Sequence, residues 1–116
     1  MAKNHNRKLK DYNPNNCPVV YSLSKIGDRW KLIIIHYIKQ GHNRYSALQK
    51  IIPDISRQTL TNKLRELEDD GILDRVVYAE IPPKVEYLIT ELGFSLNPII
   101  EEMSKWGLKF VTPNEQ

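Results

Sequence analysis

The segment SRQTLTNKLRELEDDG, which runs from Ser56 to Gly71, limits the possible folds more than any other part of the chain. Ser56 is a favourable N-cap and Gly71 a favourable C-terminal stop, so the segment predicts one helix between them. Leu60, Leu64 and Leu67 recur at i, i+4 and i+7, which places them on one narrow stripe of that helix. The stripe must be buried, and the rest of the chain must supply the core on which it lies.

The opposite face of this helix carries side chains that can read DNA bases. The amides of Gln58 and Asn62 can pair with adenine, and the guanidinium of Arg57 or Arg65 with guanine. All acids of the helix lie in residues 66–70, although the helix dipole favours acids in the first turn. This reversed order predicts that the N-terminal half enters the major groove, and the alternative is an ordinary solvated helix. The residues predicted to contact DNA are Arg44, Ser56, Arg57, Gln58, Thr59, Thr61, Asn62, Arg65 and Lys84.

The flanking segments predict a mainly helical fold with a small β-hairpin, an α+β winged helix-turn-helix. The hairpin tip, residues 78–84, is a wing that would bring Lys84 to a phosphate or the minor groove, or else it only closes the core. Pro98 predicts a kink in the last helix. Helices are expected over residues 18–26, 29–40, 44–52, 56–70 and 90–110, and strands over residues 72–80 and 84–89.

The last predicted helix carries an apolar stripe from Leu92 to Phe110 with steps of four and three residues. The preceding helices already supply a core, so we expect this stripe to bury against a second copy of the chain; the alternative is packing on its own core. A symmetric dimer would present two recognition helices to a two-fold DNA site. The residues predicted for the dimer interface are Val20, Leu23, Leu96, Ile99, Ile100, Met103, Trp106 and Phe110.

Length and charge fit one DNA-binding domain. The 116 residues are 41% hydrophobic and 27% charged, as in a globular protein. We interpret residues 1–16 as a flexible basic arm and residues 17–116 as the winged helix-turn-helix domain with terminal dimerisation helices. Residues 17–65 carry nine Lys/Arg and two acids, whereas residues 66–116 carry four and eleven. This asymmetry predicts one face built for a polyanion, or else two solvated surfaces.

Other classes of protein fit less well. No run of about eighteen apolar residues predicts a membrane span. No glycine-rich phosphate loop or Cys–His metal spacing is present, so we expect no enzyme activity, metal or cofactor. A single cysteine excludes an intrachain disulfide, which suits the cytoplasm. The rival from another class is a winged-helix protein-interaction module without a DNA target, and a thiol enzyme is a distant third.

That cysteine, Cys17, lies in NNCPVV, where Pro18 favours a first helical turn and places Cys17 at or next to the N-cap. The N–H groups of a first turn favour the thiolate form. A modified Cys17 in a dimer-forming helix could change how the two recognition helices are spaced. The alternative is a cysteine that only packs at the start of the helix.

Several motifs occur in a family order: Cys-Pro from Cys17, Gly-x-x-Trp from Gly27, Leu-Arg-Glu-Leu from Leu64 and Pro-Pro-x-Val-Glu-Tyr from Pro82. Over residues 17–107 the chain resembles HxlR-type transcriptional regulators. The resemblance implies a bacterial winged helix-turn-helix homodimer that binds double-stranded promoter DNA and is joined through its first and last helices.

The same resemblance also implies roles for particular segments. The DNA-reading helix falls on residues 56–70 and the wing on residues 78–84. Several members sense quinones, aldehydes or oxidants through the cysteine of the Cys-Pro motif, here Cys17, so a small electrophile or oxidant is the implied inducer. Some members use a second cysteine for an intersubunit disulfide, and this chain has none. The basic arm lies outside the resemblance.

Overall fold

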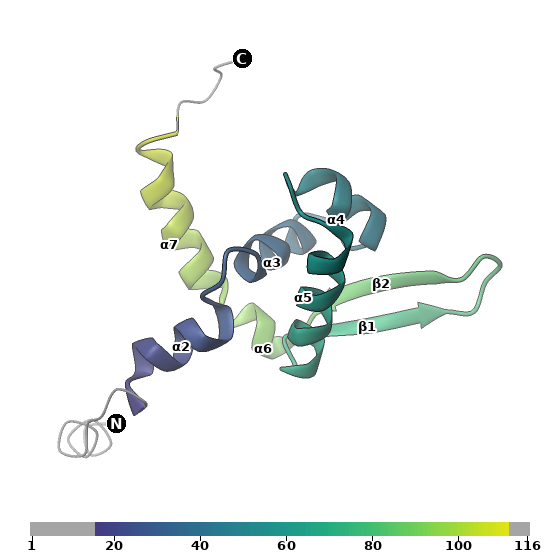
Figure 1. Ribbon diagram of the computed structural model, residues 1–116, viewed down its shortest axis with the longest axis horizontal. Coiled ribbons are helices and arrows are strands. Elements are labelled where there is room, and N and C mark those ends of the chain that lie inside the picture. Colours follow the sequence, from purple (N-terminus) through teal and green to yellow (C-terminus); the bar gives the residue numbers. More distant parts are fainter. Residues whose placement is uncertain (1–15, 112–116) are drawn as a thin grey trace.

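A computed structural model describes residues 16–111, so the basic arm predicted for residues 1–16 lies almost wholly outside the described residues. The described chain is mostly helical with one two-stranded antiparallel hairpin, which confirms the predicted fold class (Figure 1). The elements in chain order are α2 (Pro18–Ile26), α3 (Lys31–Lys39), α4 (Tyr45–Ile51), α5 (Arg57–Asp69), β1 (Leu73–Tyr78), β2 (Lys84–Ile89), α6 (Glu91–Phe94) and α7 (Asn97–Leu108).

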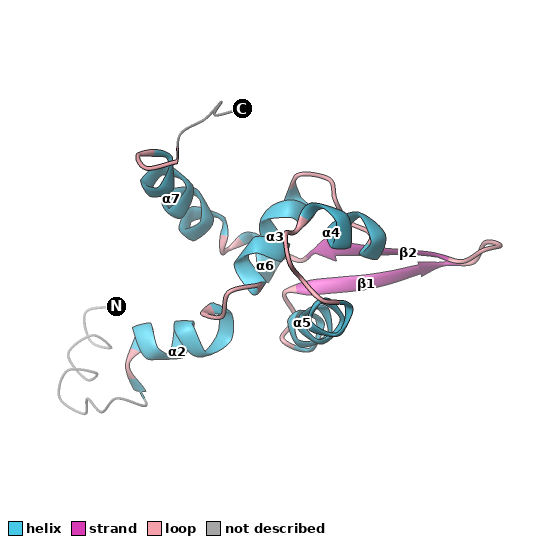
Figure 2. Cartoon of the chain, turned by 45° about the horizontal axis from the view of Figure 1, so that its top comes forward, coloured by secondary structure: helices cyan, strands magenta, loops and turns pink. Residues whose placement is uncertain are grey.

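The core gathers around α3, which lies at the centre of the molecule in Figure 2. Ile34 and Ile35 of this helix are almost completely buried. The leucine stripe of α5 packs into the same core, with Leu60 and Leu67 wholly inaccessible to solvent. Fully burying a leucine side chain stabilises a fold by roughly 1.5–3 kcal/mol, so this stripe holds α5 firmly on α3.

Both ends of α5 form as the sequence predicts. The Ser56 hydroxyl accepts the backbone N–H of Thr59 at 3.0 Å and caps the first turn. At the other end Gly71 has φ +77°, a left-handed conformation that glycine adopts without strain. The N–H groups of Gly71 and Ile72 then bond to carbonyls of the last turn at 3.0 and 2.9 Å. This Schellman arrangement stops the helix and turns the chain into β1.

The register of the hairpin decides which side chains face α5. Leu73 pairs with Ile89 and is buried in the core, so its face of the hairpin is the one turned towards the helices. Side chains alternate along a strand, and Arg75, which pairs with Tyr87, therefore lies on that same face. The last pair is Tyr78 with Lys84, on the opposite face. The two strands extend well beyond the helices, as expected for a wing (Figure 1).

The last helical segment differs from the prediction. Instead of one helix kinked at Pro98, the chain forms the short α6 and then α7, with the break at residues 95–96. Proline has no N–H to donate and its ring clashes with the carbonyl four residues earlier, so Pro98 begins a new helix at its first turn. Thr90 caps α6 by accepting the N–H of Gly93 at 3.0 Å. Phe110 lies beyond the end of α7.

Candidate nucleic-acid interface

Only some of the side chains predicted to contact DNA are exposed on α5 and make no hydrogen bond or ion pair within residues 16–111. Arg57, Gln58, Asn62 and Arg65 are all exposed, with Arg57 and Gln58 in the first turn. These four side chains can reach a ligand without breaking a hydrogen bond or ion pair to another residue in the 16–111 range. They are the side chains that can donate to, or bond bidentately with, base edges in a major groove.

The hydroxyl side chains among the residues predicted to contact DNA form hydrogen bonds that stabilise α5 itself. Ser56 and Thr59 bond to each other through their hydroxyls at 2.9 Å, in addition to the cap. Thr61 is half-buried, and its hydroxyl lies 3.1 Å from the hydroxyl of Tyr45. These three residues therefore stabilise the first two turns of α5, and a base contact from any of them would compete with that role.

Tyr45 is a residue of this interface that the sequence did not identify. Its hydroxyl donates to the backbone carbonyl of Arg57 at 2.9 Å and contacts Thr61. The side chain thus ties the start of α4 to the first turn of α5, which carries the exposed Arg57 and Gln58. In the sequence, Tyr45 is only one of several apolar residues with helical spacing. No local signal distinguishes it, because both of its partners lie more than ten residues away.

Only some of the basic side chains in the part of the chain that the structure describes form ion pairs. The lysines that form ion pairs there are Lys25, Lys31, Lys39, Lys63, Lys84 and Lys105. By contrast, no ion pair within residues 16–111 engages Arg44, Arg57, Arg65 or Arg75, and all four are exposed. Arg44 is the N-cap of α4, and the others lie on α5 and β1. Lys50 of α4 also has no ion pair within residues 16–111, and neither have Arg29, before α3, and Lys109, after α7. Most of the positive charge left without a carboxylate in this range therefore lies around α4, α5 and the root of the hairpin.

Lys84, the predicted wing contact, is largely occupied within the hairpin. Its ammonium lies 3.9 Å from a carboxylate oxygen of Glu80 and 3.9 Å from one of Glu86. It also lies 4.6 Å from the centre of the Tyr78 ring. Two acids around one lysine leave this end of the wing without net positive charge. Beyond it the tip is apolar, with Ile81 fully exposed.

A network of ion pairs fixes the side of α5 that faces α3. Lys31 is only 7% exposed, and its ammonium donates to Glu66 at 3.0 Å and to the carbonyl of Lys25 at 3.3 Å. Lys63 bonds to Asp28 at 2.9 Å and lies 3.5 Å from Glu66. Asp28 also accepts the backbone N–H groups of Trp30 and Lys31 at the start of α3. The network therefore positions α5 relative to the α2–α3 loop.

The two acids of this network have shifted pKa values. Burial alone would raise the pKa of Asp28, but bonds from Lys63 and from backbone N–H groups outweigh it, so the pKa is lowered. The hydrogen bond from Lys31 lowers the pKa of Glu66, against a smaller opposing effect of burial. Both carboxylates are therefore held in the charged form that the network needs.

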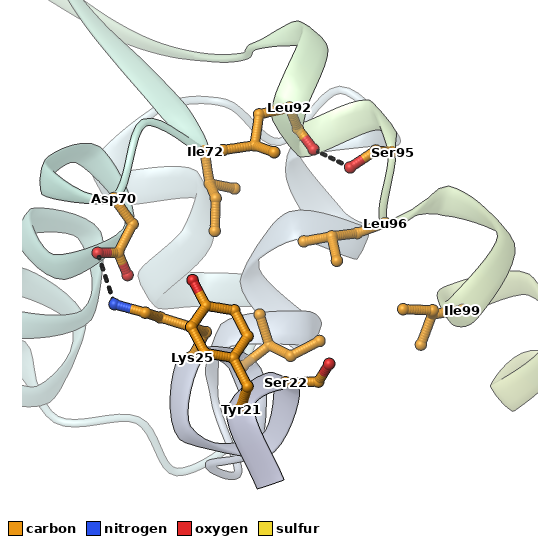
Figure 3. Close-up of a pocket in the computed structure, with 10 residues that line it drawn as sticks. Tyr21, Ser22, Lys25, Asp70, Ile72, Leu92, Ser95, Leu96 and Ile99 are labelled. Carbon is orange, nitrogen blue, oxygen red and sulfur yellow. Dashed lines mark hydrogen bonds and ion pairs between the residues drawn. The ribbon is translucent and has the colours of Figure 1, made fainter. Parts of the chain in front are cut away.

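A second link joins α2 to the end of α5. Figure 3 shows the side chain of Lys25 reaching the carboxylate of Asp70, at an N–O distance of 3.7 Å. Asp70 is the C-cap of α5, directly after its last turn. Together with the bond from Lys31 to the Lys25 carbonyl, this pair connects α2 to both the middle and the end of the candidate recognition helix.

Helices α2 and α7 expose much of their apolar surface. Both lie on the side of the molecule away from the hairpin tip (Figures 1 and 2). An apolar cleft of about 220 Å³ opens between α2 and α6 (Figure 3), and another of about 420 Å³ between α2 and α7. Of the residues predicted for a dimer interface, Leu96 is half-buried and Ile100 is buried against the chain's own core. Those that remain exposed are Val20, Leu23, Ile99, Met103, Trp106 and Phe110.

Cys17 is the N-cap residue of α2, with extended backbone, and it is partly buried. Its carbonyl accepts the N–H of Tyr21 at 2.9 Å, the first hydrogen bond of the helix. Cys17 therefore stands at the far end of α2 from Lys25. A chemical change at Cys17 and the contacts of Lys25 with α5 would act on the same helix.

Within residues 16–111, no group of three or more His, Cys, Asp or Glu side chains could hold a metal ion. None of the helices described there is long and apolar enough to span a bilayer.

Comparison with known proteins identifies the family. The model of the HxlR-like helix-turn-helix family matches residues 25–115. The HTH-type transcriptional regulator YdeP of Bacillus subtilis is 44% identical over 109 residues, which are 90% of this chain and 85% of YdeP. The structure of the redox regulator HypR in its oxidised form superposes with a TM-score of 0.78 at 44% identity, covering 83% of this chain and 99% of that one. The reduced form of the transcriptional regulator YodB from B. subtilis gives 0.68 at 38% identity, with 85% and 98% covered. The chain therefore belongs to the HxlR-like helix-turn-helix family of transcriptional regulators and has its winged-helix fold.

Proposed function

We propose that this transcriptional regulator binds promoter DNA with the N-terminal half of α5 in the major groove. The observation that carries the proposal is the division of α5 into two faces. Leu60, Leu64 and Leu67 are buried, whereas Arg57, Gln58 and Asn62 point into solvent. Arg57 and Gln58 lie in the first turn, the part of a recognition helix that contacts base edges. The exposed arginines around them supply the charge that a phosphate backbone attracts.

The contribution of single base contacts can be measured directly. Replacing Gln58 or Asn62 by Ala removes a group that can pair bidentately with adenine, which is worth about 1–3 kcal/mol, or roughly 5–150-fold in affinity. We expect this loss on the cognate duplex and little change on a shuffled duplex of the same composition, measured by fluorescence anisotropy. Lys105→Ala is the matched surface control, because Lys105 is exposed on α7 and, within residues 16–111, its one ion pair is with the exposed Glu102.

A different pattern would favour the rival function. If Gln58→Ala and Asn62→Ala left activity in the cell intact while Trp106→Ala abolished it, the chain would act as a winged-helix protein-interaction module. The proposal that α5 contacts DNA would then be wrong, although the description of the fold would still hold.

The proposed functional unit is a homodimer formed through α2 and α7. The support is the exposed apolar surface of these helices, which includes Leu23, Met103 and Trp106, each more than half exposed. Such surfaces on a small domain mark interaction sites, because leaving them in water costs free energy. Two apolar clefts on the same side of the molecule offer pockets for a partner's side chains. A two-fold dimer would present two copies of α5 to a DNA site with matching symmetry.

We also propose that an electrophile or oxidant regulates binding through Cys17. The support is the position of Cys17 at the N-cap of α2, and the similarity to the redox regulator HypR and to YodB, which has been solved in a diamide-treated form. In this chain the Cys17 sulfur would add to a ring carbon of a quinone, and the electrons of the C=C bond would move to a quinone oxygen, which takes up the thiol proton. Transfer of the ring hydrogen at that carbon to the second oxygen completes a hydroquinone thioether, so the quinone itself is the group that is reduced.

The test of this regulation combines mass spectrometry with DNA binding. After mild treatment with a quinone, we expect one adduct on Cys17 and a change in DNA affinity that Cys17→Ser abolishes. An adduct that leaves DNA affinity unchanged would reduce Cys17 to a packing residue.

A further inference from the structure

A cleft between α5 and the root of the hairpin contains two of the exposed arginines. Its volume is about 370 Å³. Arg65 of α5 and Arg75 of β1 stand on either side of it, and Glu68 contributes one carboxylate. The residues that line the cleft are Tyr45, Thr61, Arg65, Glu68, Arg75 and Tyr87. Within the described part of the chain, neither guanidinium has an ion pair, so two positive charges share this cleft with one negative charge.

The hairpin register explains why the arginine rather than the lysine of the wing belongs to this cleft. Arg75 pairs with the buried Tyr87 and lies on the face turned towards α5. Lys84 pairs with Tyr78 on the other face, where Glu80 and Glu86 surround its ammonium. The positive charge that the wing can offer to a ligand beside α5 therefore lies at its root.

Arg65 is also placed differently from the base-reading residues. It follows Arg57 by eight residues, which is roughly 12 Å further along the helix axis at 1.5 Å per residue. If the first turn of α5 points into the groove, Arg65 lies nearer to the groove edge, where the backbone runs. Guanidinium groups bind phosphate oxygens bidentately, so a phosphate between Arg65 and Arg75 would satisfy both charges.

We infer that this cleft holds a DNA backbone phosphate between Arg65 and Arg75, so that the root of the wing anchors the duplex beside α5. The inference rests on the proposed function and extends it: Arg75 becomes a DNA contact, and Arg65 becomes a phosphate contact instead of a base contact. Such a contact carries no sequence information and fixes the register of α5 in the groove.

The salt dependence of binding tests this inference. Each neutralised phosphate contributes about 0.9 to the slope of log K against log salt concentration. Arg75→Gln should therefore lower this slope by about 0.9 for each chain bound and weaken cognate and shuffled duplexes by the same factor. Lys105→Gln, which removes an equal charge from α7, should leave the slope unchanged. Glu68→Gln removes the carboxylate of the cleft and should tighten binding to both duplexes several-fold, a gain that misfolding cannot produce.

Failure of the phosphate cleft and failure of the proposed function would give different results in these measurements. Wild-type protein that binds DNA with the same slope as Arg75→Gln would overturn the phosphate cleft and leave the proposed function standing. Wild-type protein that binds no duplex would overturn both. A loss on the cognate duplex alone would show that Arg75 reads bases, which also contradicts the inference.

Discussion

The ion network behind α5 predicts an unequal effect of removing its two central partners. In Glu66→Gln the ammonium of Lys31 stays buried, at 7% exposure, and keeps the Lys25 carbonyl at 3.3 Å but loses its carboxylate at 3.0 Å. A hydrogen bond to a charged group is worth about 1.5–3 kcal/mol. The side chain of Glu66 is 49% exposed, and solvent screening reduces this value. We therefore expect Glu66→Gln to lower the free energy of unfolding by about 1–2 kcal/mol.

Substitution of the other partner, Lys31, should lower the free energy of unfolding by less. Lys31→Met replaces the buried ammonium by an apolar chain of similar length, and replacing a buried charge in this way is often neutral to within about 1 kcal/mol. Glu66 would keep Lys63 at 3.5 Å and its contact with water. In the Lys31→Met background, Glu66→Gln should then have little further effect.

Urea unfolding of the four proteins at pH 7 and one fixed protein concentration measures this double-mutant cycle. A fixed concentration is needed because association of two chains shifts the apparent stability. An equal cost of Glu66→Gln in both backgrounds would refute the reasoning, because the carboxylate would then not act through Lys31.

Three further predictions follow from other contacts. The pKa values of Asp28 and Glu66 are lowered, so their contribution to stability is complete above the unfolded pKa near 4 and is lost as the pH falls through the pKa of the folded state. Asp28→Asn should therefore make stability depend less steeply on pH in the acid range. An unchanged pH dependence there would contradict this. Trp106→Glu should yield folded monomers in sedimentation experiments, because Trp106 is 65% exposed in the single chain; a dimer of undiminished affinity would contradict an interface on α7. Tyr45→Phe should cost about 1 kcal/mol of stability and speed hydrogen exchange in the first turn of α5, whereas unchanged exchange there would show that the hydroxyl does not hold that turn.

The features of α5 that depend on residues close in the sequence could be predicted from the sequence. Its cap at Ser56, its stop at Gly71 and its buried leucine stripe all arise within one segment, and the structure confirms each of them. The start of α7 at Pro98 was predicted only as a kink, because a proline at that position is compatible with either a bent helix or a new one, and packing decides between them.

The contacts that hold and complete the candidate interface were not predictable in this way. Tyr45 meets the first turn of α5 across twelve residues, and Lys31 meets Glu66 across thirty-five, so no local pattern indicates either pair. The strand period places Arg75 and Lys84 on opposite faces only once the register is known. Which face turns towards α5 is then decided by the burial of Leu73 and Tyr87 in the core.

Selection of bound duplexes from a random DNA pool by the purified 116-residue chain tests most directly whether α5 reads DNA sequence. We expect enrichment of one two-fold symmetric site whose half-sites are about one helical turn apart, or a multiple of it. The same selection with Gln58→Ala should relax the preference at defined positions of each half-site and leave the others intact. A pool that shows no enriched sequence, or an identical site for the wild type and Gln58→Ala with undiminished affinity, would contradict the central claim.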